Sequence, residues 1–366
     1  MPQTAALAVP APAFSPSSPL PLQSRIVLVS DAWHPQRNGV VRVLVSLQAE
    51  LLAAGYQVEV IHPGLFPTLP CPTYPEIRLA LPWGNALARR LAEARPDAIH
   101  IATEGPLGAA TRRWCLKHGH PFTTAYHSKF PEYIHTRTGL PLPWLYAALR
   151  RFHRPSSAVL APSENVFREL TERGFDRVRP WAHGVDTSVF YPADKGAFHA
   201  ALSERGMTGR PLFLYVGRVT VEKNLSAFLD LDLPGARVVV GDGPQRAALI
   251  RAYPQVLFHI ANGDDELRAC YNAADVFVFP SRTDTFGLVM LEALACGVPV
   301  AAFPVTGPQD VLLDGVGTVG CLDEDLRAAA IAALSLSPQA CRRHAERFSW
   351  QEVARQFVAA LQPLRA

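Results

Sequence analysis

The sequence predicts an α/β protein made of two doubly wound domains in tandem, which face each other across an interdomain cleft. Short β-branched runs alternate with amphipathic helices, and this alternation is typical of parallel sheets covered on both faces. The alternation breaks in a polar stretch at residues 187–208 and then restarts. A chain of 366 residues is also too long for one ordinary core. Ligands usually bind in the cleft between two such domains.

The first domain is expected at residues 25–190. It opens with a strand at 25–30, a helix at 40–55 that ends at a glycine, and a strand at 56–63, which together form a doubly wound unit. Three further apolar runs are expected to be strands, at 97–103, 121–127 and 157–163.

The second domain is expected at residues 205–347, and a short helix is expected to end near 226–232. Its strands are expected at 211–218, 236–244, 257–263, 274–281 and 298–305. The last segment, 348–366, has apolar residues at helical spacing. We expect it to form a helix that crosses back to the first domain.

The composition fits a soluble globular enzyme. Hydrophobic residues make up 49% and charged residues 18% of the chain, and no apolar run reaches the roughly 18 residues that a membrane-spanning helix needs. The six cysteines are scattered without metal-ligand spacing, which favours a reducing, cytoplasmic compartment. Residues 1–24 are rich in Pro, Ala and Ser and lack a basic start, so a disordered leader is expected rather than a signal peptide.

The formal net charge is +3, and the first half of the chain is mildly basic. This balance suits an anionic surface or ligand, and it is also compatible with an ordinary solvated, arginine-rich face. Aromatic residues are not interleaved with long basic runs, so no nucleic-acid partner is expected.

Two carboxylates stand out in SRTDTFGLVMLEALACGVPV, residues 281–300. Glu292 lies on an otherwise apolar helix, where an unpaired charge is costly, so it needs a partner. An ion pair and a bound ligand both meet that need. Asp284 precedes the helix and is either its N-cap or part of a ligand site.

The segment between these acids turns into the helix, so the first helical amides would include those of Phe286, Gly287 and Leu288. Such amides attract phosphate or sugar oxygens, and Gly287 lets a ligand approach the backbone. Arg218 and Lys223 lie in YVGRVTVEKNL, at the predicted carboxyl end of a strand. Both side chains suit a phosphate, although such a pair alone is also typical of a solvated loop.

These motifs, together with GDGP and TAYHSKFPEY, resemble the retaining glycosyltransferases of family four, the group 1 glycosyltransferases, which have the GT-B fold. The resemblance covers about residues 25–360. It implies a nucleoside diphosphate sugar (NDP-sugar) held mostly on the second domain, an acceptor received on the first, and no metal or other cofactor. Asp230-Leu231-Asp232 lies far from the acid pair and is interpreted as a helix exit, not as a metal site.

By this resemblance, five residues would be catalytic. Asp284 would contact a sugar hydroxyl, where the family usually has a glutamate, one methylene longer. Glu292 would contact the ribose hydroxyls, and Arg218 and Lys223 would neutralise the departing diphosphate. His127 stands at the position of a family histidine that contacts the donor sugar near the reacting carbon, although a lone histidine is more often structural.

The resemblance also places a glycine-rich loop at HPQRNGV (34–40), where Gly39 matches and Asn38 replaces a frequent second glycine. The expected donor-binding residues are Gly39, Gly217, Gly241, Gly243, Thr285, Phe286, Gly287 and Leu288. Retention of stereochemistry is implied, and no carboxylate is evident as a nucleophile on the acceptor side. A front-face displacement, in which the leaving phosphate helps to deprotonate the acceptor, is therefore the mechanistic hypothesis.

LPLPWLYAALRRFHRPS, residues 140–156, predicts a helix with an aromatic face beside cations. Such a helix lies on an anionic membrane surface, or it is an ordinary surface helix with snorkelling arginines. The candidate membrane or acceptor residues are Trp144, Tyr146, Arg150, Arg151 and Arg154.

Several members of the family with similar FPEY, TDTFG and FPVTGP segments glycosylate lipids. The resemblance therefore implies a metal-independent, retaining α-glycosyltransferase that moves a hexosyl group from UDP- or GDP-hexose to a membrane lipid such as diacylglycerol or a phospholipid. The expected location is the inner face of the plasma membrane. Two alternatives stay open: a soluble enzyme of polysaccharide or small-glycoside synthesis, and a nucleotide-sugar-binding protein without catalysis.

Overall fold

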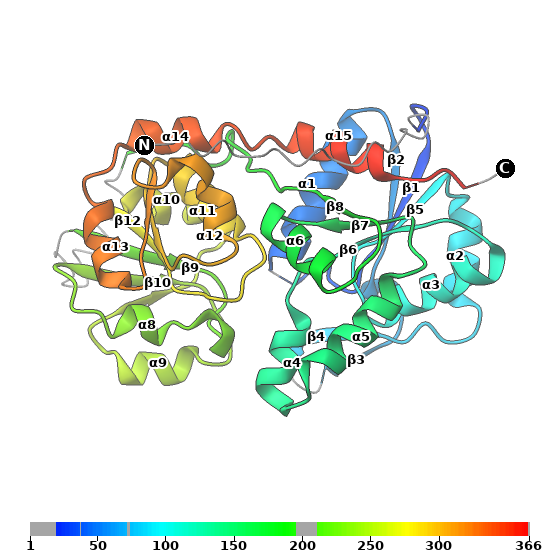
Figure 1. The fold of residues 1–366 in the computed structure, drawn as a ribbon, viewed down its shortest axis with the longest axis horizontal. Helices are drawn as coiled ribbons and strands as arrows, with labels where there is room; N and C mark the ends of the chain where they lie inside the picture. Colours follow the sequence, from blue (N-terminus) through cyan, green and yellow to red (C-terminus); the bar gives the residue numbers. More distant parts are fainter. Residues whose placement is uncertain (1–19, 37, 72–73, 195–210, 365–366) are drawn as a thin grey trace, which may run out of the picture.

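The computed structural model describes residues 20–36, 38–71, 74–194 and 211–364, whose helices and strands form two lobes (Figure 1). Each lobe is built on a six-stranded sheet in which neighbouring strands pair in parallel. The predicted fold class, two doubly wound α/β domains, is confirmed.

The sheet of the first domain has the strand order β2-β1-β5-β6-β7-β8. Strand β1 lies inside the sheet and is apolar and buried from Ile26 to Val29, because helices cover both faces of the sheet. Leu28 lies between Val60 on β2 and His100 on β5. The strands are β1 (Arg25–Val29), β2 (Gln57–Ile61), β5 (Ala98–Ile101), β6 (Thr123–Ala125), β7 (Ala158–Ala161) and β8 (Val178–Pro180).

The first helix of this domain begins after Asn38, whose side chain accepts a 3.0 Å hydrogen bond from the amide of Val41. Asn38 is therefore an N-cap, which explains a residue other than glycine at this position. The helices are α1 (Gly39–Ala53), η1 (Pro63–Leu65), α2 (Ala86–Ala94), α3 (Pro106–His118), α4 (Phe130–Thr138), α5 (Leu142–His153) and α6 (Glu164–Glu172). An antiparallel pair that the sequence did not predict joins β3 (Thr68–Cys71) to β4 (Tyr74–Ala80).

The second domain repeats the architecture with the strand order β11-β10-β9-β12-β13-β14. Leu214 on the central strand lies between Val238 and Phe277. The strands are β9 (Leu212–Val216), β10 (Ala236–Val240), β11 (Leu257–His259), β12 (Val276–Phe279), β13 (Val300–Ala302) and β14 (Gly320–Leu322). The helices are η2 (Val221–Lys223), α8 (Ser226–Leu229), α9 (Arg246–Ala252), α10 (Asp264–Ala273), α11 (Leu288–Ala295), α12 (Pro308–Leu312), η3 (Leu313–Gly315), α13 (Leu326–Ala333) and α14 (Pro338–Ala345).

The last helix, α15 (Trp350–Ala360), follows the second domain in sequence but lies on the first, against α1 (Figure 1). The indole nitrogen of Trp181 donates a 3.0 Å hydrogen bond to the main-chain oxygen of Val353. The ring of Phe357 packs edge-on against His100, with ring centroids 4.9 Å apart. The chain therefore passes between the domains twice.

Two sequence expectations concern chain segments at the edges of the described ranges. The leader expected at 1–24 falls mostly outside them, but Leu20 is buried and its carbonyl accepts a 3.3 Å hydrogen bond from the hydroxyl of Tyr56. The expected leader is therefore wrong for residues 20–24. Most of the expected linker, at 195–208, lies outside the described residues. None of the helices within the described ranges is both long and apolar enough to cross a membrane.

Candidate active site

The candidate site lies between the domains, at the carboxyl ends of strands from both sheets, where doubly wound folds bind ligands. The chain runs from β6 to His127, from β9 to Gly217 and Arg218, and from β12 to Asp284. A hydrogen bond joins the loops of the two domains: Thr285 Oγ1 donates to the main-chain oxygen of His127 at 2.8 Å.

Two helix N-termini are near neighbours across this cleft. α1 begins at Gly39 and α11 begins at Leu288. A methyl group built on Gly39 would lie 3.9 Å from Cδ1 of Leu288. The first-turn amides and the positive ends of two helix dipoles are therefore close together, which favours an anionic ligand.

Asp284 forms an ion pair with Lys223, which η2 carries. The other carboxylate oxygen of Asp284, Oδ2, is buried and has no hydrogen-bond partner among the described residues. Asp284 is not the N-cap of α11, because that position is Gly287. A buried acceptor without a partner suits a ligand hydroxyl.

Glu292 is 4% exposed in the middle of α11. Its Oε1 accepts from Nε of Arg42 at 2.8 Å, and its Oε2 accepts from the hydroxyl of Tyr271 at 2.8 Å. Arg42 lies on α1, so this ion pair crosses the cleft. The ion-pair interpretation of Glu292 therefore holds in this structure, and the carboxylate still faces the opposite domain.

His127 is partly exposed, but its ring nitrogen Nε2 is buried and has no partner within the described ranges. Burial lowers the pKa of His127 to about 4, so the ring is neutral near pH 7. The ring stacks on His183, with centroids 5.8 Å apart. The ring of His183 in turn packs against Phe286 of the second domain at 5.3 Å.

The loop after β9 is held by a hydrogen bond from Tyr215 and by an ion pair to the first domain. The hydroxyl of Tyr215 donates a 2.9 Å hydrogen bond to the main-chain oxygen of Arg218. Burial, with the nearby charges of Asp284 and Glu222, raises the pKa of Tyr215, which keeps it a hydrogen-bond donor. Arg137 of the first domain forms a 3.1 Å ion pair with Glu222, the neighbour of Lys223 in η2.

Gly241 and Gly243, two of the glycines expected near the donor, are also required by packing between two loops. A methyl group on Gly241 would lie 1.9 Å from the carbonyl oxygen of Gly217, and one on Gly243 would lie 2.5 Å from that of Val219. Gly241 and Gly243 also have φ values of 148° and 155°, which residues with a side chain rarely adopt. The close approach that these glycines permit here is that of one loop to another.

Two of the expected donor-binding side chains pack into the protein. Phe286 is 3% exposed, and its ring also contacts Phe348, with centroids 6.4 Å apart. Leu288 belongs to the same buried core cluster. Any donor contact of Phe286 would therefore involve its backbone rather than its ring.

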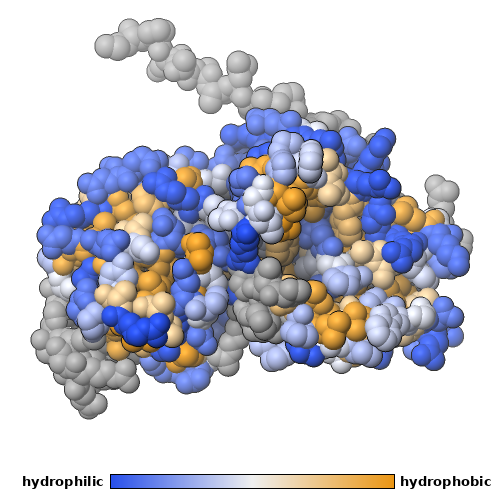
Figure 2. Space-filling view, turned by 90° about the horizontal axis from the view of Figure 1, so that it is seen from below, coloured by the Kyte–Doolittle hydropathy of each residue, from blue (hydrophilic) through white to orange (hydrophobic). Residues whose placement is uncertain are grey.

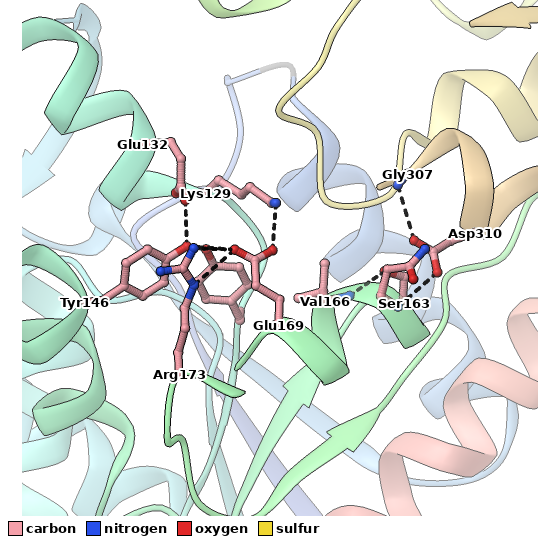
Figure 3. A network of polar contacts seen from close by, with 11 residues as sticks. Lys129, Glu132, Tyr146, Ser163, Val166, Glu169, Arg173, Gly307 and Asp310 are labelled. Carbon is pink, nitrogen blue, oxygen red and sulfur yellow. Dashed lines mark hydrogen bonds and ion pairs between the residues drawn. The ribbon is translucent and has the colours of Figure 1, made fainter. Parts of the chain in front are cut away.

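Sequence reasoning missed several cross-domain contacts. Besides Arg42 and Arg137, it missed Asp310, whose Oδ1 accepts a 3.1 Å hydrogen bond from the amide of Asn165 on α6. Its Oδ2 accepts from the amide of Gly307 at 3.2 Å (Figure 3). A cation in the first turn of α1, three residues after Gly39, was the available signal for Arg42.

Tyr146 was expected on a membrane-facing surface, and this expectation is wrong. The side chain is 4% exposed, and its hydroxyl donates a 2.7 Å hydrogen bond to Oε1 of Glu132. Figure 3 shows it inside a polar network in which Lys129 and Arg173 both pair with Glu169. Burial opposes ionisation of Glu169, but these two cations hold its pKa below the ordinary value.

The other candidate membrane residues remain at the surface. Trp144 is 71% exposed at the start of α5. Arg150, Arg151 and Arg154 are exposed as well. Arg150 donates a 2.8 Å hydrogen bond to the main-chain oxygen of Arg173, so part of its guanidinium is engaged within the protein.

The Asp-Leu-Asp sequence is engaged in structural contacts. Asp230 Oδ1 accepts a 2.6 Å hydrogen bond from the hydroxyl of Tyr253, and the main-chain oxygen of Asp232 accepts from Arg327 at 2.7 Å. Within the described ranges, no cluster of three His, Cys, Asp or Glu side chains is arranged to hold a metal ion.

Both halves of the chain match glycosyltransferase family models. Residues 37–189 match Glycosyltransferase Family 4, and residues 210–337 match Glycosyl transferases group 1. A GDP-mannose-dependent alpha-mannosyltransferase of Mycobacterium tuberculosis (strain CDC 1551 / Oshkosh) is 32% identical over 311 residues, which cover 79% of this chain and 81% of that protein. The chain belongs to glycosyltransferase family 4, and it is a glycosyltransferase with the GT-B fold.

A more distant relative matches almost end to end. It is a GDP-mannose-dependent alpha-(1-6)-phosphatidylinositol dimannoside mannosyltransferase of Mycobacterium tuberculosis (strain ATCC 25177 / H37Ra), 26% identical over 375 residues, which cover 92% of this chain and 96% of the relative. Among solved structures, sucrose-phosphate synthase from Thermosynechococcus elongatus has a TM-score of 0.71 at 21% identity, over 91% of this chain and 97% of that one. This second likeness concerns the fold alone.

Proposed function

We propose that this glycosyltransferase moves a hexosyl group from an NDP-sugar to a lipid hydroxyl, with retention of configuration and without a metal. One observation carries the proposal: Lys223 pairs with Asp284 in the cleft where the N-termini of α1 and α11 are neighbours. A diphosphate and its attached sugar need a cation, helix-start amides and a hydrogen-bond acceptor together.

Each candidate residue has a distinct role in this proposal. Lys223 and Arg218 stabilise the charge that develops on the leaving diphosphate. The unpartnered Oδ2 of Asp284 accepts a hydrogen bond from a sugar hydroxyl. Glu292 accepts from the ribose, and neutral His127 contacts the sugar through its buried Nε2.

The proposed reaction is a front-face displacement. The bond between the anomeric carbon and the phosphate oxygen breaks, and the acceptor oxygen bonds to the same face of that carbon. The acceptor proton passes to the departing phosphate, so the products are the glycoside and the protonated nucleoside diphosphate. This step needs no protein nucleophile, and the protein supplies orientation and charge stabilisation.

The proposed donor is a GDP- or UDP-hexose. GDP-mannose is the donor named for both mannosyltransferase relatives, so it is the first candidate. An NDP-sugar panel in a thermal-shift assay discriminates among donors, because a ligand at 100 times its Kd adds about 2.7 kcal/mol of stability.

The proposed acceptor is a membrane lipid, and the enzyme would act as a peripheral protein on the cytoplasmic face. The name of the second mannosyltransferase relative includes phosphatidylinositol dimannoside, which is a glycolipid. α3 and α5 contain no Asp or Glu, and Arg112, Arg113 and Arg151 line a hollow of about 310 Å³ between them. Figure 2 views the molecule from the side on which α5 lies in Figure 1, and hydrophobic and hydrophilic surface are interspersed there. Basic and apolar groups together suit an anionic membrane.

Release of the nucleoside diphosphate in the presence of lipid acceptors tests this function. Asp284→Ala should lower kcat/KM by about 100-fold, since a preorganised polar contact to the donor is lost. Asp284→Glu, which has the residue more usual in the family, should keep most of the activity. The matched control is Asp314→Ala, at an exposed ion-paired aspartate of the same domain.

Three results would contradict the proposal in different ways. Equal activity of Asp284→Ala and Asp314→Ala would mean that the site is misplaced. Donor binding without nucleotide release for any hydroxyl acceptor would favour a non-catalytic binding protein. Turnover with soluble sugars but not with lipids would favour polysaccharide or small-glycoside synthesis.

A further inference from the structure

Arg42 of the first domain contacts two acids of the second domain. Its Nε lies 2.8 Å from Oε1 of Glu292 on α11, and both of its terminal nitrogens donate to Oδ1 of Asp264 on α10 at 3.0 Å. Its guanidinium also lies over the ring of Phe190, 5.0 Å from the centroid. One side chain of the first domain is therefore fixed by two acids of the second.

Glu292 depends on this contact for its charge balance. The Glu292 side chain is 5% exposed, and Arg42 is its one ion-pair partner within the described part of the chain. Tyr271 adds a hydrogen bond but no charge, because burial and the charge of Glu292 raise the pKa of its hydroxyl and keep it neutral. A buried carboxylate without a cation is strongly destabilised. The second domain alone therefore does not complete the environment of Glu292.

The ion pair and the hydrogen bond do not use the full acceptor capacity of this carboxylate. Each carboxylate oxygen has two lone-pair directions, and Arg42 and Tyr271 each occupy one oxygen. One acceptor direction per oxygen is left for a hydroxyl. Arg42 can thus orient Glu292 without replacing the ligand.

We propose that Arg42 is a positioning residue for the donor: from the first domain it holds the Glu292 carboxylate in a fixed orientation, so that the nucleotide site is complete only when the domains are closed. The inference rests on the proposed function, in which Glu292 accepts hydrogen bonds from the ribose. The inference adds Arg42 to the donor site, besides the two acids Asp284 and Glu292 and the cations Arg218 and Lys223. Domain closure and donor affinity are then coupled through one guanidinium.

The two ion pairs of Arg42 differ in strength. The Glu292 side chain is 5% exposed, whereas the Asp264 side chain is 49% exposed and is screened by solvent. Asp264→Asn should therefore change donor affinity little. Arg42→Gln should weaken donor affinity at least about tenfold. The effect of Arg42→Lys should lie between those of Asp264→Asn and Arg42→Gln, because an ammonium keeps the charge but lacks the planar fork of the guanidinium.

The test measures donor dissociation constants and steady-state kinetics for a double-mutant cycle of Arg42→Gln and Glu292→Gln. If Arg42 acts through Glu292, Arg42→Gln weakens donor binding in the wild-type background and has little further effect in the Glu292→Gln background. The donor KM should rise more than kcat falls. Arg168→Gln, which removes an exposed ion-paired arginine from α6, is the matched control and should bind donor normally.

Chemical rescue separates positioning from general loss of stability. Added guanidinium at millimolar concentration should restore part of the donor affinity of Arg42→Ala and should leave Arg168→Ala unchanged. Unaltered or tighter donor binding by Arg42→Gln would overturn the inference, as would equal effects of Arg42→Gln in both backgrounds. If the wild type itself binds no NDP-sugar, the proposed function fails, so the two failures are distinguishable.

Discussion

The hydroxyl of Thr285, on the second domain, donates a 2.8 Å hydrogen bond to the main-chain oxygen of His127, on the first. The contact joins the loop of the acid motif to the loop of the candidate catalytic histidine. The contact requires the two loops to stay within hydrogen-bond distance, so it fixes His127 next to the acid motif in this arrangement of the domains.

Thr285→Val tests this contact. The substitution keeps the shape of the side chain and removes its hydroxyl, so we expect about a tenfold loss of kcat with a smaller change in donor affinity. The melting temperature should fall only slightly, because one net hydrogen bond contributes about 1 kcal/mol. Unchanged kcat would show that His127 is positioned without Thr285. Thr171→Val, at an exposed threonine of α6, is the control.

Buried histidines should make the free energy of unfolding depend on pH. Burial lowers the pKa of His100 from 6.5 to about 3 and lowers that of His183 well below 6.5. As the pH falls below about 6.5, the unfolded chain binds protons that the folded chain does not, so stability falls. Each such histidine contributes a slope of about 1.4 kcal/mol per pH unit.

Urea unfolding between pH 7 and 4 measures this slope. His100→Gln retains a polar side chain that cannot titrate, so its slope should be shallower than that of the wild type by about one proton. His118→Gln, at an exposed histidine of α3, serves as the control and should keep the wild-type slope. Identical slopes for all three proteins would contradict the assignment of His100.

The contact between the two glycine loops predicts a large loss of stability. Gly241→Ala would bring a methyl group to 1.9 Å from the oxygen of Gly217, at a φ of 148°, so we expect a cost of about 3 kcal/mol. Gly263→Ala also has a positive φ but meets no atom within 4 Å, and it should cost about 1 kcal/mol. Chemical denaturation compares the two variants, and equal costs would exclude the steric explanation.

The arginine-lined hollow predicts binding to anionic vesicles. Arg113 and Arg151 are exposed, and none of the ion pairs between described residues involves either of them. Neutralising both as glutamine should weaken binding to phosphatidylglycerol vesicles about 10- to 30-fold at low salt, because each basic residue near the surface contributes about 1 kcal/mol. Flotation measures the bound fraction.

The control for vesicle binding is the pair Arg251→Gln and Arg343→Gln, at exposed arginines of the second domain. This double variant should float like the wild type. Phosphatidylcholine vesicles should not discriminate among the three proteins. Equal flotation of both double variants on anionic vesicles would show that this surface does not contribute to membrane binding.

The fold was predictable because its signal is local. The apolar run of β1 and the helix that starts at Gly39 can each be recognised from a few neighbouring residues. The β3–β4 pair was missed because both strands contain proline, which argues against a strand. Tyr146 was misplaced although Leu149 and His153, at helical spacing from it, share its buried face. That spacing was the signal for its burial.

The site was only half predictable, for a different reason. Lys223 and Asp284 lie in recognisable segments, and their pairing joins two loops of one sheet. The partner of Glu292 is Arg42, which is 250 positions away and on the other domain. A single sequence does not show how two domains are oriented toward each other, so such a pair can be identified only from the arrangement of the lobes.

The two passages of the chain between the domains touch each other: the amide of Val185 donates a 3.0 Å hydrogen bond to the oxygen of Phe348, and a methyl group on Gly184 would lie 2.8 Å from the nitrogen of Trp350. A pivot with two adjacent backbones resists torsion more than a single linker does. The lobes should then open by rotation about one hinge axis near these two segments. The residues farthest from that axis should move the greatest distance.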